Sequence, residues 1–119
     1  MRPPTLKSAK KRAWNSFSRY IIARDKSCVT CGRKENLQAG HFWHACLDFD
    51  EININAQDTY CNKYLSGNLA TYSVYLIKKY GIKEFRVLEK RHYKALKGEK
   101  RTIEEYLEIE SHYKALLGR

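Results

Sequence analysis

No run of apolar residues in this chain approaches the roughly 18 to 20 that a membrane-spanning helix needs. The first four residues, Met1-Arg2-Pro3-Pro4, also lack the apolar stretch of a secretory signal peptide. The sequence contains no internal repeat, no low-complexity tract and no visible domain boundary. We therefore expect an intracellular protein of a single domain, residues 1–119, with no membrane partner.

Acidic residues are scarce. The 119 residues include 23 Lys and Arg against 13 Asp and Glu, which gives a formal net charge of +10. This excess of positive charge indicates a polyanionic partner, nucleic acid before membrane. A chain of this length builds only a modest hydrophobic core, to which a structural metal would add useful support.

The spacing of the cysteines indicates a metal site. Cys28 and Cys31 form a C-x-x-C-G knuckle, and Cys61 follows much later in the chain. In a reducing compartment such thiols are better explained by metal than by disulfides. A thioredoxin-type redox pair is the alternative, but the strand-then-helix setting of that motif is missing. The knuckle therefore predicts a structural Zn²⁺ site.

The sequence leaves the fourth zinc ligand open. The knuckle and Cys61 supply three thiolates, and Asp58 stands where a second C-x-x-C would have its first cysteine. A carboxylate oxygen is an acceptable zinc ligand, so we favour Asp58. His44 or Cys46 would replace it if the loop after residue 43 folded back, and Cys46 is otherwise a small buried hydrophobe.

The first two parts of the chain predict a basic helix and a hairpin. Apolar residues recur at helical spacing after Pro4 and predict an amphipathic N-terminal helix within residues 1–26. Residues 27–80 then hold the knuckle and two short strands, at 38–43 and 51–57, followed by a helix that starts at Cys61.

The last part of the chain, residues 81–119, predicts a helical hairpin. One helix is expected over 83–96, and a T-x-x-E capping box at Thr102 opens a final helix with an apolar side. Together with the predicted strands, these helices make the expected fold class α+β.

The segment between the knuckle and Cys61 carries candidate catalytic residues. A phosphodiesterase needs a base that activates water and a hard divalent cation that neutralises charge on the phosphate. His41 suits the first role, and Asn62 offers a carbonyl oxygen to Mg²⁺. Asn53, on the predicted return strand, would orient the imidazole and fix its tautomer. These three residues converge if the two cysteine segments meet at one zinc.

Basic side chains would line the nucleic acid, although any single lysine is more often simply solvated. The candidates lie on the N-terminal helix and around the later helix: Lys10, Lys11, Arg12, Lys63, Lys78 and Lys79. The sequence Ser66-Gly67-Asn68 either breaks this later helix or brings backbone close to a phosphate. In the second case Asn68 would contact DNA or support the metal site.

Several segments together carry a family resemblance: Cys28-x-x-Cys31-Gly32, Gln38-Ala39-Gly40-His41-Phe42, Asp48-Phe49-Asp50-Glu51-x-Asn53, Gln57, Cys61-Asn62, Leu65-Ser66-Gly67-Asn68-Leu69, Tyr72, Leu76 and Lys79-Tyr80-Gly81. With them the chain resembles the phage NinG/Rap recombination endonucleases from about residue 28 to the C-terminus. More distantly it is similar to the phage resolvase endonuclease VII, whose zinc-bound core carries a histidine base and an asparagine after the last cysteine. That similarity carries over to His41 and Asn62.

The resemblance implies a zinc-stapled ββα-metal core of the HNH, or His-Me finger, type. The implied activity is a metal-dependent DNA endonuclease that acts on branched recombination intermediates such as Holliday junctions and D-loops, with Mg²⁺ or Mn²⁺ as catalytic metal. Symmetric cleavage of a four-way junction needs two active sites, so we expect a homodimer. The expected location is the cytoplasm of a phage-infected or prophage-carrying bacterium.

Three positions depart from the pattern of these families. Asp58 stands where a cysteine is usual, Asn55 where many members have a histidine, and Gly40 where many HNH nucleases have a metal-binding aspartate. These departures support an alternative, a non-catalytic zinc-stapled DNA-binding module with a degenerate nuclease site. A zinc-containing protein-interaction adaptor is a third hypothesis, but it leaves the basic charge without a role.

Overall fold

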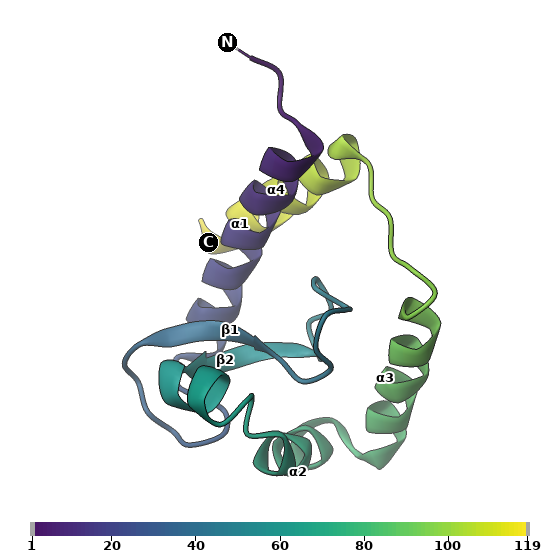
Figure 1. Cartoon of the computed structure of the whole chain (residues 1–119). Helices are drawn as coiled ribbons and strands as arrows, with labels where there is room; N and C mark the ends of the chain where they lie inside the picture. Colours follow the sequence, from purple (N-terminus) through teal and green to yellow (C-terminus); the bar gives the residue numbers. More distant parts are fainter. Residues whose placement is uncertain (1, 119) are drawn as a thin grey trace.

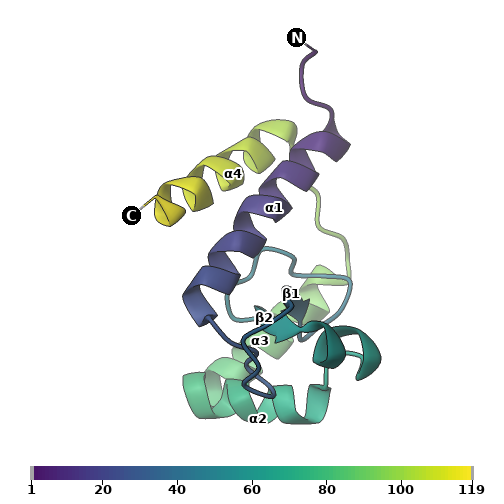
Figure 2. The same cartoon turned by 90° about the vertical axis from the view of Figure 1, so that its left-hand side faces the viewer.

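The computed structural model describes residues 2–118. In chain order these residues form α1 (Leu6–Asp25), β1 (Leu37–His41), β2 (Ile54–Asp58), the short π-helix η1 (Tyr60–Tyr64), α2 (Leu69–Tyr80), α3 (Ile82–Ala95) and α4 (Ile103–Leu117). The hairpin of β1 and β2 lies between the α1 and α4 pair and the segment from η1 to α3 (Figures 1 and 2). The fold is therefore α+β, as the sequence predicts.

Helix α1 confirms the predicted N-terminal helix. Thr5 caps it by accepting a hydrogen bond from the main-chain N–H of Ser8, and the Ser8 hydroxyl accepts one from the N–H of Thr5 in return. The helix ends at Lys26, whose φ of 65° is left-handed. Between these ends, a stripe of small and aromatic residues is fully buried: Ala9, Ala13, Phe17 and Ile21.

Helix α4 packs on α1. Its predicted capping box is present, because the Thr102 hydroxyl accepts the N–H of Glu105 while the Glu105 carboxylate accepts the N–H of Thr102. Tyr106 packs with Ala9 and Ala13, and Tyr113 meets Phe17 edge-on at 4.8 Å between ring centroids. Figure 2 shows the two helices side by side.

The predicted helical hairpin of residues 81–119 is wrong. Helix α3 packs on α2, and residues 96–102 carry the chain across the molecule to α4, which lies on α1 instead (Figure 1). The apolar sides of the two helices have different partners. Leu88 of α3 joins a cluster with Phe42 and Tyr72, whereas the tyrosines of α4 fit the stripe of α1. The two helices therefore bury their apolar sides in different parts of the core and do not form a hairpin.

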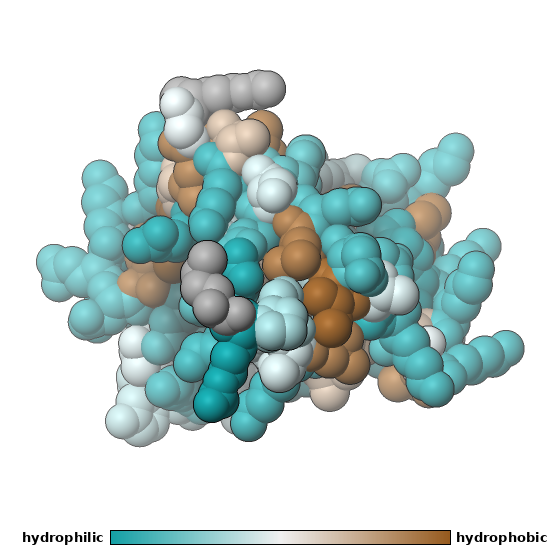
Figure 3. Space-filling view, turned by 90° about the horizontal axis from the view of Figure 1, so that it is seen from above, coloured by the Kyte–Doolittle hydropathy of each residue, from teal (hydrophilic) through white to brown (hydrophobic). Residues whose placement is uncertain are grey.

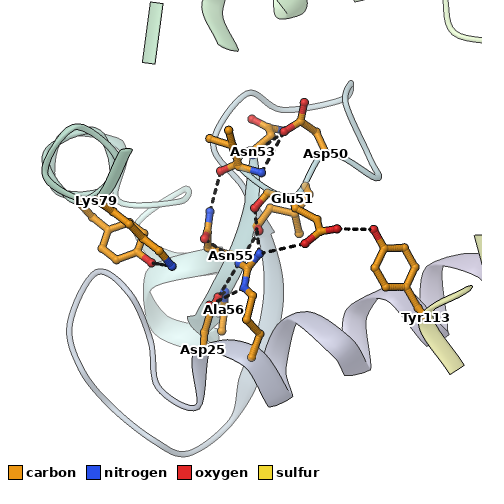
Figure 4. Close-up of polar contacts among 12 residues, drawn as sticks. Asp25, Asp50, Glu51, Asn53, Asn55, Ala56, Lys79 and Tyr113 are labelled. Atoms are coloured by element: carbon orange, nitrogen blue, oxygen red, sulfur yellow. Dashed lines mark hydrogen bonds and ion pairs between the residues drawn. The ribbon is translucent and has the colours of Figure 1, made fainter. Parts of the chain in front are cut away.

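The antiparallel hairpin pairs Leu37 with Asp58 and His41 with Ile54. It confirms the predicted hairpin, although both strands are shorter than the sequence predicts. All five residues of β2 are buried, and Ile54 and Ala56 pack with Phe17 and Ile21 of α1. Arg24 and Asp25 at the end of α1 bind the outer edge of β2. Figure 4 shows this edge, where the Asp25 carboxylate accepts the main-chain N–H of Ala56 at 2.8 Å.

The face of the molecule that Figure 3 shows is mainly hydrophilic. Seen from above, long polar side chains fringe the face, and hydrophobic side chains gather in a narrow strip (Figure 3). Among residues 2–118, no helix is long and apolar enough to cross a membrane.

Candidate metal centre and nuclease site

Four potential metal ligands meet beside the hairpin. Cys28 and Cys31 come from the knuckle, whose turn is closed by a 2.8 Å hydrogen bond from the N–H of Gly32 to the carbonyl of Cys28. Gly32 has a φ of +83°, where a side chain would be strained. Asp58 ends β2 and Cys61 lies in η1, and the ligand atoms of all four residues lie within 4.8 Å of one another.

Three of the four residues are buried and hydrogen-bonded, whereas Cys31 is exposed. Asp58 is 2% exposed, and its Oδ1 accepts the main-chain N–H of Cys61 at 3.0 Å. This hydrogen bond lowers the pKa of the Asp58 carboxyl, even though burial opposes ionisation. Burial raises the pKa of the Cys61 thiol to about 12. Burial also acts against ionisation of Cys28, but hydrogen bonds from Thr30 and the main chain lower its pKa overall.

The donor set fits a tetrahedral Zn²⁺. With Zn–S bonds of about 2.3 Å, sulfurs at the corners of a tetrahedron lie about 3.8 Å apart, so the cluster needs only a small contraction. Three thiolates and a carboxylate carry more negative charge than one dication neutralises. Arg33, whose Nε lies 3.5 Å from Asp58 Oδ2, offsets part of this excess. Binding would release the thiol protons and connect the knuckle to the end of β2.

The alternative fourth ligands lie elsewhere. Cys46 is buried and its Sγ lies 3.2 Å from Nδ1 of His92 on α3, within the cluster around Phe42. His44 is exposed, with its ring close to Gly67. Of the three candidates, Asp58 is the one that the structure brings to the cysteines.

His41, the candidate base, ends β1 on the face of the hairpin that packs against α1. Its ring stacks on Trp14 with centroids 5.4 Å apart, and its Nε2 lies 2.9 Å from Oδ1 of Asp48. This hydrogen bond lowers the pKa of the Asp48 carboxyl. Lys10 reaches the other carboxylate oxygen at 3.9 Å. The imidazole side chain stays 23% exposed, beside a cavity of about 120 Å³.

The prediction that Asn53 orients this imidazole is wrong. The Asn53 side chain is fully buried, and it accepts the main-chain N–H of Trp43 at 2.8 Å while donating to the carbonyl of Trp43 at 3.1 Å. An amide can satisfy both kinds of main-chain group in the loop after β1, so Asn53 holds that loop. Asp48 takes the place beside His41. It belongs to an irregular loop whose geometry gives no periodic signal in the sequence.

Two further asparagines, Asn55 and Asn68, form hydrogen bonds within the protein. Asn55, which is labelled in Figure 4, is fully buried and accepts a hydrogen bond from Arg24 at 2.8 Å. It also donates to the hydroxyl of Tyr72 at 3.1 Å. Asn68 begins α2, and its amide lies 3.8 Å from Sγ of Cys61. Asn68 therefore supports the candidate metal centre, and Asn55 is occupied in the core.

Asn62, the candidate magnesium ligand, lies on the other face of the hairpin. Its amide donates to Oε1 of Gln38 at 2.8 Å, and its Oδ1 lies next to Gly40. Successive residues of a strand point to opposite faces, so His41 and Asn62 flank β1 from two sides. Gly40 also explains the missing aspartate, because any Cβ there would collide with Oε1 of Gln57.

The basic residues predicted to touch DNA differ in what surrounds them. Lys11, Lys63 and Lys78 are exposed, and Lys79 is exposed with its amine 3.1 Å from the hydroxyl of Tyr75. Arg12 forms an ion pair with Glu110 of α4 at 2.8 Å, so it connects two helices. Among the candidates within residues 2–118, the side chains of Lys11, Lys63 and Lys78 are thus exposed without a hydrogen bond or ion pair.

Comparison with known proteins identifies the family. Residues 5–119 match the family described as bacteriophage lambda NinG protein. The chain belongs to the NinG family. It is 35% identical to protein ninG of Salmonella phage P22 over 115 residues, covering 90% of this chain and 55% of that relative.

Relatives in other phages agree with this membership. The chain is 33% identical to protein ninG of Escherichia phage lambda, covering 90% of this chain and 54% of that relative, and 33% identical to protein ninG of Escherichia phage 933W. The chain spans about half the length of these NinG relatives. No solved structure gives a significant match to it.

Proposed function

We propose that this NinG chain is a metal-dependent DNA endonuclease acting on branched recombination intermediates such as Holliday junctions and D-loops. In this proposal His41 activates the attacking water, Asn62 helps to hold Mg²⁺ or Mn²⁺, and a zinc in the Cys28, Cys31, Asp58 and Cys61 cluster fixes the hairpin. Cleavage of both strands of a junction would require two copies, as a homodimer. The observation that carries the proposal is the contact between His41 and Asp48.

That contact suits a general base. The Asp48 carboxylate accepts a hydrogen bond from Nε2, at 2.9 Å, and therefore favours the tautomer with its proton on that nitrogen. Nδ1 then keeps the lone pair that can take a proton from water. Asp48 also favours the imidazolium that forms when the proton arrives.

The open edge of β1 supplies a place for the phosphate. Ala56 of β2 uses its main-chain groups on Asp25 and Val29, so its partner Ala39 in β1 directs its own main-chain groups outward, away from β2. A phosphate at this edge would lie between His41 on one face and Asn62 on the other. An excess of ten positive charges favours the approach of a polyanion.

The decisive experiment measures cleavage of a labelled four-way junction beside a matched linear duplex, with Mg²⁺, Mn²⁺ or EDTA. We expect metal-dependent cutting of the junction and a loss of about 10² to 10⁴ in rate for His41→Ala. Asp48→Asn should lose less, because the amide oxygen can still accept the hydrogen bond from Nε2 but carries no negative charge. His112→Ala, which removes an exposed histidine of α4, is the matched control. Cutting by His41→Ala at the wild-type rate would refute this mechanism.

A second candidate function follows from the placement of His41 and Asn62 on opposite faces. If no phosphate bridges them around the edge of β1, the chain is a non-catalytic zinc-stapled DNA-binding module. The same experiment separates the two, because such a module binds the junction and cuts nothing with any metal.

A further inference from the structure

The π-helix η1 exposes two aromatic rings beside the candidate metal centre. Tyr60 is 56% exposed and Tyr64 is 77% exposed, and their rings stack at 6.0 Å between centroids with an interplanar angle of 28°. By contrast, Tyr72 is fully buried, and Tyr106 and Tyr113 are each 7% exposed. Large aromatic side chains usually enter the core, so a stacked pair at the surface indicates a recognition role.

The backbone beneath the two rings is firmly held. Cys61 lies between them in sequence and is 1% exposed, with its main-chain N–H bound to Asp58. The carbonyl of Cys61 accepts the N–H of Gly67 at 2.8 Å, and the carbonyl of Tyr60 accepts that of Leu65 at 3.0 Å. One side of η1 is therefore anchored in the metal-ligand cluster, and the opposite side presents the rings. In Figure 1 this turn lies beside the hairpin, before α2.

A basic side chain accompanies the rings. Lys63 lies within η1 between the two tyrosines and is exposed, and from Thr59 to Lys83 the sequence has no aspartate or glutamate. A stacked aromatic pair with a lysine beside it complements a ligand that combines flat rings with negative charge. Single-stranded nucleic acid has this chemistry, since bases stack on aromatic rings while phosphates meet basic side chains.

We propose that Tyr60 and Tyr64 form a stacking platform for unpaired nucleobases. In a continuous duplex the bases are stacked on one another and cannot reach a protein ring, whereas a displaced strand offers unpaired bases and an open strand exchange point interrupts the stacking. The platform would therefore favour branched DNA over plain duplex. This inference rests on the proposed DNA substrate and names the feature of that substrate which the chain recognises.

The test is equilibrium binding by fluorescence anisotropy, with Zn²⁺ present and without Mg²⁺ or Mn²⁺. The probes are a linear duplex, the same duplex with a three-nucleotide bulge, and that bulge built from abasic sites. Loss of stacking on one base corresponds to roughly 5- to 150-fold in affinity. Tyr60→Ala with Tyr64→Ala should therefore weaken bulge binding about 10-fold or more and duplex binding less than 2-fold.

Two matched variants separate the aromatic ring from other contributions. Tyr60→Phe with Tyr64→Phe keeps the rings and should bind the bulge within about 2-fold of wild type. Tyr93→Ala, which removes a tyrosine of α3 that is 59% exposed, should leave bulge and duplex binding unchanged. For the wild-type chain, abasic sites should reduce bulge binding to the level of the double alanine variant. This last comparison needs no variant, so it holds even if a substitution disturbs the fold.

The proposal is overturned if the alanine pair weakens duplex and bulge equally, if the phenylalanine pair loses as much as the alanine pair, or if abasic sites bind like normal ones. Failure of the nuclease proposal looks different. In that case the wild-type chain prefers the bulge over the duplex but cuts neither with any metal. If the chain cuts DNA but binds the bulge no better than the duplex, the stacking platform is refuted and the nuclease proposal stands.

Discussion

Replacing Asp58 with asparagine tests the candidate metal centre most directly. The amide keeps the size of the side chain and the oxygen that accepts the N–H of Cys61, but it removes the negative charge of one of four ligands that lie within 4.8 Å of one another. Changes in residues that merely support a ligand cost about 10- to 100-fold in metal affinity. We therefore expect Asp58→Asn, a change in the ligand itself, to bind Zn²⁺ at least about 100-fold more weakly.

This loss has a consequence for stability. When free Zn²⁺ is far above the dissociation constant, a 100-fold weaker site lowers the free energy of unfolding by about 2.7 kcal/mol. For a chain of this size that change corresponds to a Tm lower by about 10 °C. Without zinc the variant and the wild type should differ much less, because the hydrogen bond to Cys61 persists.

The assay is thermal unfolding followed by circular dichroism, with buffered Zn²⁺ or with EDTA, together with the zinc content of the purified chain. Asp58→Cys should retain the zinc-dependent gain in Tm, because it supplies a fourth thiolate. Glu108→Gln, which removes an exposed charge of α4, should behave as wild type in both buffers. An equal zinc-dependent gain in Tm for wild type and Asp58→Asn would refute the assignment of Asp58 as a ligand.

Three further predictions concern the elements that position the site. Gly40→Ala should lower the free energy of unfolding by about 1–3 kcal/mol in urea titrations, because the added Cβ collides with Gln57, whereas Gly118→Ala should change it little. Tyr72→Phe should cost about 1–3 kcal/mol by the same measurement, since the fully buried hydroxyl donates to the carbonyl of Gly40 at 2.8 Å and accepts from Asn55. The hydrogen bond from Arg12 lowers the pKa of Glu110 in the folded protein. The ionised carboxylate should therefore stabilise the fold at a pH above about 4.3, the pKa of an unfolded glutamate. This stabilisation should be lost as the pH falls through the lower pKa of the folded state. Glu110→Gln should therefore show a smaller loss of stability than wild type between pH 6 and about 3, and identical pH profiles would contradict the role of this pair.

Local signals in the sequence predicted much of the fold. Capping residues and spacing located α1 and the start of α4, since these signals act within a few residues of each other. The partner of α4 could not be predicted in this way. Tyr106 and Tyr113 pack on Ala9, Ala13 and Phe17, nearly a hundred residues earlier, and no local pattern marks that pairing. Because the connection between α3 and α4 is short, the sequence favoured packing of these two helices on each other.

In the candidate site, too, features with a local sequence signal were predictable and contacts made by the folded chain were not. The metal-ligand cluster was predictable because cysteine spacing and the carboxylate at Asp58 reflect the chemistry of a single ion. The hydrogen-bond partner of His41 was not predictable. Asp48 and Asn53 are both polar and both follow His41 in the chain, and only the folded loop determines which of them faces the imidazole. Gln57 belongs to the motifs that resemble the family, but its position next to Gly40 was not predicted, because no local pattern marks that contact.

The packing of α4 on α1 also affects how the protein is made. Helix α1 leaves the ribosome before α4, but Tyr106, which packs on Ala9 and Ala13, belongs to α4. At about 5–20 residues per second, the apolar side of α1 stays without its partner for roughly 5–20 s. Because contacts between distant segments also form slowly, completion of this helix pair should be a late step of folding. During that interval the hairpin and its cysteine cluster can already assemble, so the candidate metal centre can form before the two ends of the chain meet.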